Sequence, residues 1–241
     1  MDTVRIGTAG WSVAREAAAR FPSEGSGLER YAARFDAVEI NSSFHRPHRI
    51  STWQRWHDSV PESFRFAVKI PKWITHEARL VDCSGALESF LAEAGALGGK
   101  LGVLLVQLPP KLEFDADVAI RFFEDLAGRS PAVIACEPRH ASWFDEKADR
   151  LLAALRVARV AADPARCEGA DEPGGWRGLS YWRLHGSPVI YRSSYADRMV
   201  SYASALKAEA AAGRQTWCVF DNTASSAATC DALALSDALG A

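Results

Sequence analysis

Short runs of β-forming residues alternate with segments of helical periodicity along the whole chain, and this alternation restricts the fold more than any other feature. The strand-like runs are Val4–Thr8, Ala37–Asn41, Phe64–Ile70, Gly102–Gln107, Ala132–Glu137, Val157–Asp163, Ser180–His185 and Thr216–Asp221. The helix-like segments are Leu28–Phe35, Ser51–Val60, Ser84–Leu97, Asp115–Leu126, Asp145–Arg156, Tyr195–Ala212 and Thr223–Leu239. Such alternation is typical of α/β proteins, in which helices connect parallel strands.

The number of strand-like runs predicts the architecture. Eight strands with intervening helices in 241 residues indicate a single α/β domain over residues 1–241, a TIM-type (β/α)8 barrel. Residues 164–179 have the composition of a loop, so we expect the sixth helix to be short or missing. A doubly wound open sheet is the alternative. Its glycine-rich phosphate turn is absent after the first strand, where the chain reads Thr8-Ala9-Gly10-Trp11.

Charged or amide side chains stand near the carboxyl end of seven of these eight runs. Side chains alternate between the two faces of a strand, so Lys69 lies on the face opposite Phe66 and Val68. Glu39 and Asn41 likewise share one face of their strand. An unpaired charge in a protein core is costly, and the carboxyl ends of barrel strands are where catalytic and binding sites form. The alternative is a mutually satisfied network of Glu, Arg and Lys side chains that only fills the barrel.

Charge and cysteine content limit the partners and the compartment. The 28 Lys and Arg residues nearly balance the 30 Asp and Glu residues, and the formal net charge of −2 does not favour nucleic acid as a partner. No apolar run is long enough for a membrane span, and the first residues, MDTVRIGTAGW, lack the features of a signal peptide. The five cysteines include no CxxC pair. We therefore expect a cytoplasmic protein with a small-molecule substrate and no membrane partner; the sequence does not indicate an oligomeric state.

Seven segments, in order along the chain, resemble the domain-of-unknown-function 72 family of YecE-like proteins. They read IGTAGWS, FDAVEINSSFHRP, FAVKIPKWITHEARL, LGVLLVQLPP, CEPRHASWF, YWRLHG and FDNT, and the resemblance extends over roughly residues 4–235. It implies a TIM-type barrel and supplies no reaction. The polar motif positions of the family fall on Glu39, Asn41, Lys69, Thr75, His76, Gln107, Glu137, Arg139, His140, Arg183, His185, Gly186 and Asn222. Val13, His45 and Asp221 depart from the family pattern, which commonly has Tyr, Tyr and Asn there.

Four residues at the strand ends are candidates for catalysis: Glu39, Lys69, Glu137 and His185. The two glutamates, on the second and fifth strands, form either an acid–base pair across the mouth or ion pairs with nearby cations. Glu137 is the candidate general acid–base, because the apolar run Ala132–Cys136 should raise its pKa, whereas a neighbouring cation would lower it. Lys69 is expected to stabilise developing negative charge, with pairing to a carboxylate or Schiff-base chemistry as alternatives. His185 is a candidate proton carrier.

Further residues are candidates for substrate binding. Arg139 and Arg183 offer guanidinium groups suited to a carboxylate or a phosphate, so we expect them to anchor the anionic part of a substrate. The other candidate binding residues are Asn41, His76, Gln107, Asn222 and Trp11. At the end of the last run, alternation does not decide whether Asp221 or Asn222 faces the site.

No cofactor is expected, and a metal ion is the less favoured interpretation of the acidic residues. Separate strands of a barrel can assemble a metal site, here from Glu39, Glu137, Asp163, His185 and Asp221. Lys69, Arg139 and Arg183 would share the same mouth, and their positive charges nearly balance the carboxylates.

Together these residues predict an enzyme, a hydrolase, lyase or isomerase, acting on a small anionic or sugar-like substrate by Glu acid–base chemistry. The alternative is a non-catalytic ligand- or nucleic-acid-binding barrel that uses the arginines and a rim of tryptophans. Trp11, Trp73 and Trp143 each follow a strand by a few residues, where they either line the mouth or cap the core. A displaced pKa beside a vacant cavity would favour the enzyme.

Overall fold

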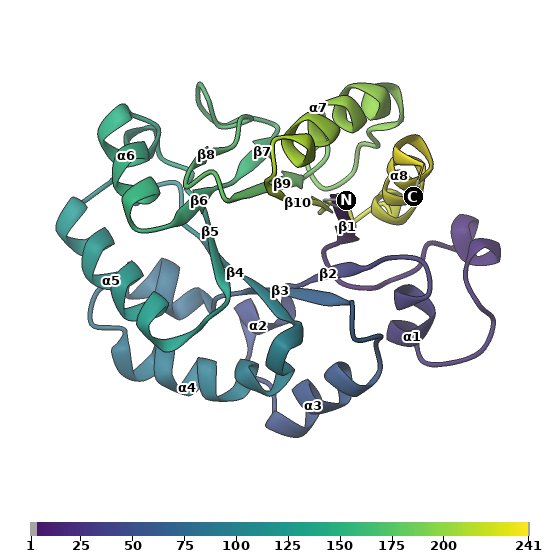
Figure 1. Ribbon diagram of the computed structural model, residues 1–241, viewed down its shortest axis with the longest axis horizontal. Helices are drawn as coiled ribbons and strands as arrows, with labels where there is room; N and C mark the ends of the chain where they lie inside the picture. Colours follow the sequence, from purple (N-terminus) through teal and green to yellow (C-terminus); the bar gives the residue numbers. More distant parts are fainter. Residues whose placement is uncertain (1–3, 241) are drawn as a thin grey trace.

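The computed structural model describes residues 4–240, and its strands form two sheets (Figure 1). The four-stranded sheet has the order β1 (Val4–Thr8), β10 (Gln215–Phe220), β9 (Leu179–Leu184) and β7 (Ala161–Asp163). The six-stranded sheet has the order β2 (Ala37–Ile40), β3 (Arg65–Lys69), β4 (Leu101–Gln107), β5 (Val133–Glu137), β6 (Val157–Arg159) and β8 (Gly174–Gly175). Neighbouring strands run parallel, except that β8 is antiparallel to β6.

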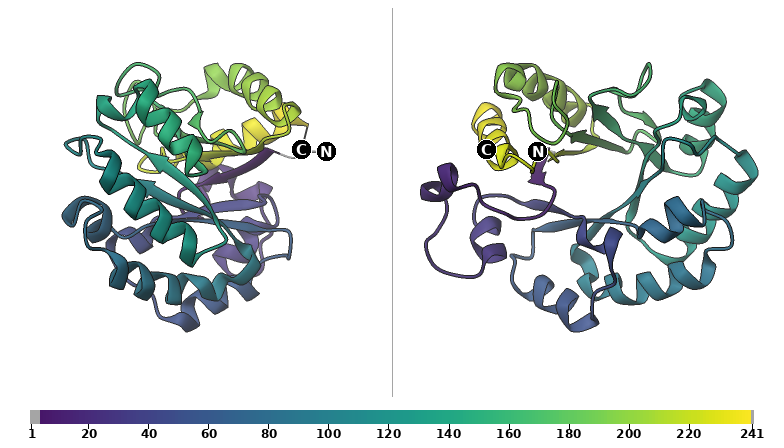
Figure 2. Two further views of the ribbon diagram at one scale, coloured as in Figure 1. Left: turned by 60° about the vertical axis from the view of Figure 1, so that its left-hand side comes forward. Right: turned by 180° about the vertical axis from the view of Figure 1, so that it is seen from behind.

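Helices lie on the outside of both sheets, as Figure 2 shows from two further directions. The longer helices are α1 (Gly27–Ala32), α3 (Ile50–Asp58), α4 (Ser84–Ala94), α5 (Ala116–Arg129), α6 (Glu146–Ala154), α7 (Met199–Ala211) and α8 (Ala227–Leu239). The short ones are α2 (Ser42–His45), the π-helix η2 (Trp73–Glu77) and the 3-10 helices η1 (Arg15–Arg20), η3 (Gly95–Lys100), η4 (Ala141–Trp143) and η5 (Ala196–Arg198). The seven longer helices fall within or beside the seven segments predicted from the sequence, with shifted ends.

The two sheets do not form the single closed (β/α)8 barrel that the sequence predicts, and that expectation is wrong. The predicted strand Val157–Asp163 is interrupted at Val160, so β6 stays in one sheet while β7 pairs with β9 in the other. At the second junction, β1 and β2 are joined by an isolated bridge between Ala9 and Glu39. Strand periodicity predicts strands, but their pairing depends on contacts between residues far apart in the sequence.

Strand β8 lies within residues 164–179, which the sequence predicts to be a loop. Its two residues are glycines, which have low β-propensity and therefore give no strand signal. Arg159 on β6 approaches Gly174 closely: a Cβ built on Gly174 would meet the Arg159 guanidinium and a carboxylate oxygen of Asp149, so these side chains would have to shift. Within the described residues, no helix intervenes between β7 and β9.

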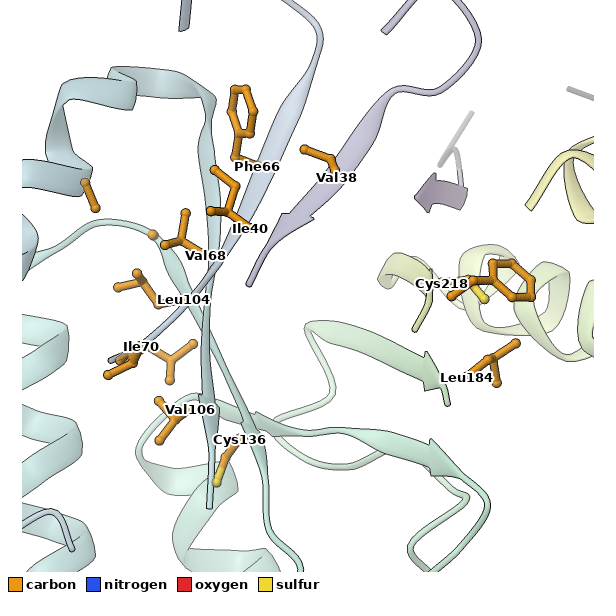
Figure 3. Packing of buried hydrophobic residues seen from close by; sticks show 14 of the residues in the cluster. Val38, Ile40, Phe66, Val68, Ile70, Leu104, Val106, Cys136, Leu184 and Cys218 are labelled. Atoms are coloured by element: carbon orange, nitrogen blue, oxygen red, sulfur yellow. The ribbon is translucent and has the colours of Figure 1, made fainter. Parts of the chain in front are cut away.

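Alternation along the strands gives two buried faces, as the sequence predicts. Phe66, Val68 and Ile70 belong to the large core shared with the helices, part of which Figure 3 shows. The opposite faces form a smaller core between the two sheets, where Tyr181 of β9 stacks on Trp217 of β10 with ring centroids 5.8 Å apart. Polar residues continue this inner face at the carboxyl ends of the strands: Glu39, Lys69, Gln107, Glu137 and Arg183.

No helix within residues 4–240 combines the length and the apolar character needed to cross a membrane. The cytoplasmic location and the assignment of the chain to a single domain remain predictions from the sequence.

Candidate active site

Arg183 on β9 is the centre of a cluster of buried charges. Its side chain is fully buried, and its Nε and Nη2 lie 3.0 and 2.7 Å from the two carboxylate oxygens of Glu39 on β2. Nη2 also donates to Asp221, which follows β10, at 3.0 Å. Nη1 donates to Glu137 on β5. One guanidinium is therefore bound by carboxylates from both sheets.

Glu137 has several donors besides Arg183. Its Oε1 accepts hydrogen bonds from Nε2 of Gln107 at 3.0 Å and from Nε and Nη2 of Arg139 at 3.1 and 3.0 Å. Burial raises the pKa of Glu137, but Arg183, His185 and Arg139 outweigh that effect and hold it well below its ordinary range. Of the two opposing effects that the sequence indicates for Glu137, the neighbouring cations therefore dominate over desolvation by the apolar strand.

His185 lies between two carboxylates, just after β9. Its Nδ1 is 2.9 Å from Oδ2 of Asp221, and its Nε2 is 3.3 Å from Oε1 of Glu137. Burial lowers the pKa of His185, but Glu137 and Asp221 overcome that effect and raise it. Asp221, rather than Asn222, is thus the residue of the last strand end that faces the charged cluster. Burial raises the pKa of Asp221, but Arg183 and His185 outweigh that effect and lower it below its ordinary value.

Lys69, the last residue of β3, lacks the pairing that the other charges have. Its side chain is largely buried, and within residues 4–240 no carboxylate forms an ion pair with its Nζ. The Nζ lies 4.0 Å from the ring centroid of Phe44 in α2, a cation–π contact. Burial and the charge of Arg183 lower the pKa of Lys69 to about 8, although the carboxylates of the cluster oppose this shift.

His76 lies on the π-helix η2, close to Lys69. Its Nδ1 is 2.8 Å from the hydroxyl of Thr75, and its ring packs edge-on against Phe44, with centroids 5.1 Å apart. Burial lowers the pKa of His76, and the charges of Lys69, Arg139 and Lys72 lower it further. His76 is therefore neutral at neutral pH and lies on the positively charged side of the cluster.

A cavity of about 10 Å³ adjoins the cluster and is lined in part by Glu137, Arg139 and His185. It has room for about one water molecule. Four larger hollows, of about 230 to 390 Å³, are lined by other residues.

Comparison with known proteins identifies the family. A family model described as "Protein of unknown function DUF72" matches residues 5–241. The chain belongs to the DUF72 family. The UPF0759 protein YecE of Escherichia coli (strain K12) is 33% identical to it over 82 residues, which are 34% of this chain and 30% of YecE. The match thus spans less than a third of that curated relative.

Two solved DUF72 structures share the fold. A DUF72 protein from Enterococcus faecalis V583 has a TM-score of 0.84 at 18% identity, over 99% of this chain and 96% of that chain. One from Thermotoga maritima MSB8 has a TM-score of 0.74 at 21% identity, over 99% and 100% of the two chains. These comparisons confirm the predicted family, and the names of these three DUF72 or UPF0759 proteins give no reaction.

In this DUF72 chain, Asn222 and Trp11 have partners of their own, outside the cluster around Arg183. Asn222 is fully buried and directs its Nδ2 to the carbonyl of Ser193 and to Oδ2 of Asp231, at 2.9 and 2.6 Å. It therefore holds a loop rather than facing the cluster. Trp11 packs edge-on against Trp56 on α3, with centroids 5.2 Å apart.

The side chains of Asn41 and Asp163 form none of the described hydrogen bonds or ion pairs of the cluster around Arg183. Asn41 is half-buried at the start of α2, and its Oδ1 is buried without a hydrogen-bond partner among the described residues. Asp163 accepts hydrogen bonds from Arg198, Tyr195 and Tyr202. The carboxylate of Asp163 therefore does not join the other residues considered for a metal ion, which are Glu39, Glu137, His185 and Asp221.

Two residues that contact Glu39 or Lys69 were not among the candidate site residues predicted from the sequence. Tyr181 donates a hydrogen bond from its hydroxyl to Oε2 of Glu39, at 2.9 Å. It shares a strand face with Arg183, so the alternation within residues 180–185 contains the signal that would have found it. Phe44 lies on α2, a helix too short to leave a periodic pattern, and no sequence signal places it beside Lys69.

Proposed function

We propose that this DUF72 chain is an enzyme of the hydrolase, lyase or isomerase class that transfers a proton from Lys69 to a small anionic substrate. The observation that carries this proposal is the state of Lys69: largely buried, without an ion-paired carboxylate, and with a pKa of about 8. A general acid is most effective when its pKa lies near the working pH. At neutral pH the ammonium is mostly protonated, so it can donate a proton or stabilise developing negative charge.

The charges around Lys69 favour an anionic substrate. The carboxylates of Glu39, Glu137 and Asp221 are bound by Arg183, and none of them forms an ion pair with Lys69 within residues 4–240, so the positive charge of Lys69 is available to an anion. Arg139 keeps 13% of its side chain exposed, whereas Arg183 is fully buried. Arg139 is therefore the better anchor for a substrate anion, and Arg183 is better suited to holding the carboxylates in place.

The glutamates have a supporting role in this proposal. A carboxyl whose pKa is well below its ordinary range is a weak base, so Glu137 is a poorer proton carrier than Lys69. Glu39 and Glu137 instead bind Arg183, and Glu137 raises the pKa of His185.

The proposal is tested first on the free protein. The ε-carbon signal of Lys69, followed by NMR from pH 6 to about 11, should titrate near the value of 8 that its surroundings give it. Lys69→Met identifies the signal, and Lys72→Met is the matched control, because Lys72 is 52% exposed and pairs with Glu77. Titration of Lys69 at the ordinary value of about 10.5 would refute the proposal.

The second test is turnover. Small phosphorylated and carboxylated sugars and acids are incubated with the protein, and product formation is followed by NMR. We expect Lys69→Met to lower the rate about 100-fold or more and Lys72→Met to change it less than about twofold. Equal rates in the two variants would contradict the role of Lys69.

The full pairing of the carboxylates favours a second candidate, a non-catalytic ligand-binding protein. Trp73, next to Lys72 in the chain, has 44% of its surface exposed and offers an aromatic face to a ligand. Trp143 is buried and cannot share that role. Binding of a compound without turnover, unchanged in Lys69→Met and lost in Trp73→Ala, would favour this candidate.

A further inference from the structure

One ring nitrogen of His185 is buried without a hydrogen bond. The Nδ1 atom lies 2.9 Å from Oδ2 of Asp221, and the Nε2 atom lies 3.3 Å from Oε1 of Glu137. Within residues 4–240, Nε2 nevertheless has no hydrogen-bond partner, although only 4% of the side chain is exposed. Leaving a buried polar atom without a hydrogen bond is costly, so a partner from outside the chain would stabilise this arrangement.

The small cavity beside the cluster provides the space for such a partner. Its lining includes His185, Glu137 and Arg139. The Nδ1 edge of the ring is turned to Asp221, which does not line the cavity, so the edge that carries Nε2 is the one beside Glu137, which does. The volume of about 10 Å³ has room for a single oxygen atom with its hydrogens and for nothing larger.

The outer wall of this cavity is formed by residues nearer the surface. Arg166 is exposed, and Pro164 and Ile190 are half-buried. The inner wall contains Glu137 and His185, both of which are buried. One group of a ligand can therefore reach the inner wall while the rest of the ligand stays outside, against the outer residues.

The inner wall offers both donors and an acceptor of hydrogen bonds. The carboxylate of Glu137 accepts, and Arg139 has an Nη1 without an acceptor within residues 4–240. The Nε2 of His185 donates when the ring is charged and accepts when it is neutral. A water molecule or a hydroxyl group both donates and accepts, so it fits either form of the ring. The oxygen of a carboxylate or a phosphate only accepts, and the charge of Glu137 would repel it.

From this cavity and the unpartnered Nε2 we infer a binding site for one hydroxyl-type oxygen, which is a water molecule in the free protein and a hydroxyl group of the substrate in the complex. The assignment to the substrate rests on the proposed function and narrows its substrate class to a small anion with a hydroxyl group, such as a hydroxy acid or a sugar acid. The anionic part of that substrate stays outside the cavity, where the exposed Arg166 and the partly exposed Arg139 belong to the lining.

The water molecule is tested on the unmodified protein, so this measurement does not depend on the folding of a variant. A high-resolution crystal structure should show a water oxygen within about 3.2 Å of both Nε2 of His185 and a carboxylate oxygen of Glu137. A structure in which no ordered water contacts Nε2 would overturn the site.

Glycolate and acetate are the probes for the substrate hydroxyl, because they share a carboxylate and only glycolate carries a hydroxyl group. NMR chemical-shift titrations at pH 7 compare the unmodified protein, Ala170→Val and Ala205→Val. Ala170 is buried and lines the cavity, so the added methyl groups fill it. Ala205 is the matched control, since it lines a separate hollow of about 230 Å³ that accommodates them.

We expect glycolate to bind about tenfold or more tightly than acetate to the unmodified protein and to Ala205→Val. In Ala170→Val the two affinities should agree within about twofold, because the hydroxyl group has lost its place. Equal affinities in the unmodified protein, or a preference for glycolate that survives in Ala170→Val, would overturn the hydroxyl site.

The two proposals fail in different ways. A Lys69 that titrates at about 10.5, in a protein that holds the water and prefers glycolate, refutes the proton donor and leaves the hydroxyl site standing. A Lys69 that titrates near 8, in a protein that shows neither the water nor the preference, refutes the hydroxyl site alone.

Discussion

Arg183 on β9 donates two hydrogen bonds to Glu39 on β2, at 3.0 and 2.7 Å, and both side chains are completely shielded from solvent. The two strands belong to different sheets. This buried pair therefore joins the sheets through their shared interior, where apolar contacts alone would leave their relative position less tightly specified.

Removal of Arg183 should strongly destabilise the fold. Arg183→Met leaves Glu39, Glu137 and Asp221 buried without their common cation, and we expect a loss of about 3–5 kcal/mol in the free energy of unfolding, measured with urea. Adding Glu39→Gln to Arg183→Met should restore part of this loss, since one stranded charge is removed.

The matched control for Arg183 is Arg150→Met. Arg150 pairs with Glu146 on the exposed surface of α6, so its replacement should change the free energy by about 0.5 kcal/mol or less. Similar losses in the two methionine variants would show that the buried cluster does not support the fold.

Glu137→Gln and Lys69→Met should have opposite effects. Glu137→Gln leaves Arg139 and part of Arg183 without a carboxylate, at a cost of about 3–5 kcal/mol. The lowered pKa of Lys69 means that folding opposes its protonated form, so Lys69→Met should stabilise the protein by about 1–3 kcal/mol at pH 7. This gain should disappear as the pH rises from about 8 toward 10.5, because the lysine of the folded protein then becomes neutral.

The double variant separates a functional Lys69 from a structural one. We expect the two effects to couple by about 1 kcal/mol or less, because Glu137 raises the pKa of Lys69 but forms no ion pair with it in the described structure. Large losses in both single variants that the double variant recovers would mark a structural pair and contradict the proton-donor role.

His185 should make stability decrease with rising pH. The folded-state pKa of His185 is raised above its unfolded value of about 6.5, so its stabilising contribution is complete below about pH 6.5. It is lost as the pH rises through the folded-state pKa. The lowered pKa values of Glu137 and Asp221 affect stability only in acid.

The measurement compares urea unfolding of the unmodified protein and of His185→Gln from pH 6 to about 9. The difference between the two free energies should be largest at the acidic end and decrease with pH. A constant difference across this range would show that His185 is not protonated in the folded protein.

Gly174→Ala tests the pairing of β8 with β6. The added methyl group would displace the Arg159 guanidinium and a carboxylate oxygen of Asp149 from their mutual hydrogen bond, so we expect a loss of about 1 kcal/mol. Gly128→Ala, in α5 with open space around the new Cβ, should instead stabilise by about 0.5–1 kcal/mol. Thermal melts of the two alanine variants provide the comparison, and a tolerated Gly174→Ala would argue against the close approach of Arg159.

The sequence predicted the inner faces of the strands well, because a period of two residues determines which side chains share a face. Glu39, Lys69, Gln107, Glu137 and Arg183 all extend the inner core as expected. The same argument failed at Asp221 and Asn222, which follow the last residue of β10, so strand alternation no longer applies to them. Their orientations are set by the partners Arg183 and Asp231.

The pairing of the strands into two sheets and the pKa of Glu137 could not be predicted from the sequence, for a different reason. The pairing of Gly174–Gly175 with β6 and of β7 with β9 joins residues that are distant in the chain. The pKa of Glu137 depends on a balance of desolvation and cation distances, and the sequence indicated both effects without their relative size.

The separation of β6 from β7 at Val160 divides the site between the two sheets. Glu39, Lys69 and Glu137 are carried by the six-stranded sheet, while Arg183 is carried by the four-stranded one and His185 follows it. A molecule in which either sheet detaches loses the ion pairs of Arg183 with Glu39 and Glu137 and has no assembled site. Binding of substrate by such a molecule would have to follow reassembly, so the affinity measured for any ligand includes the free energy of holding the sheets together.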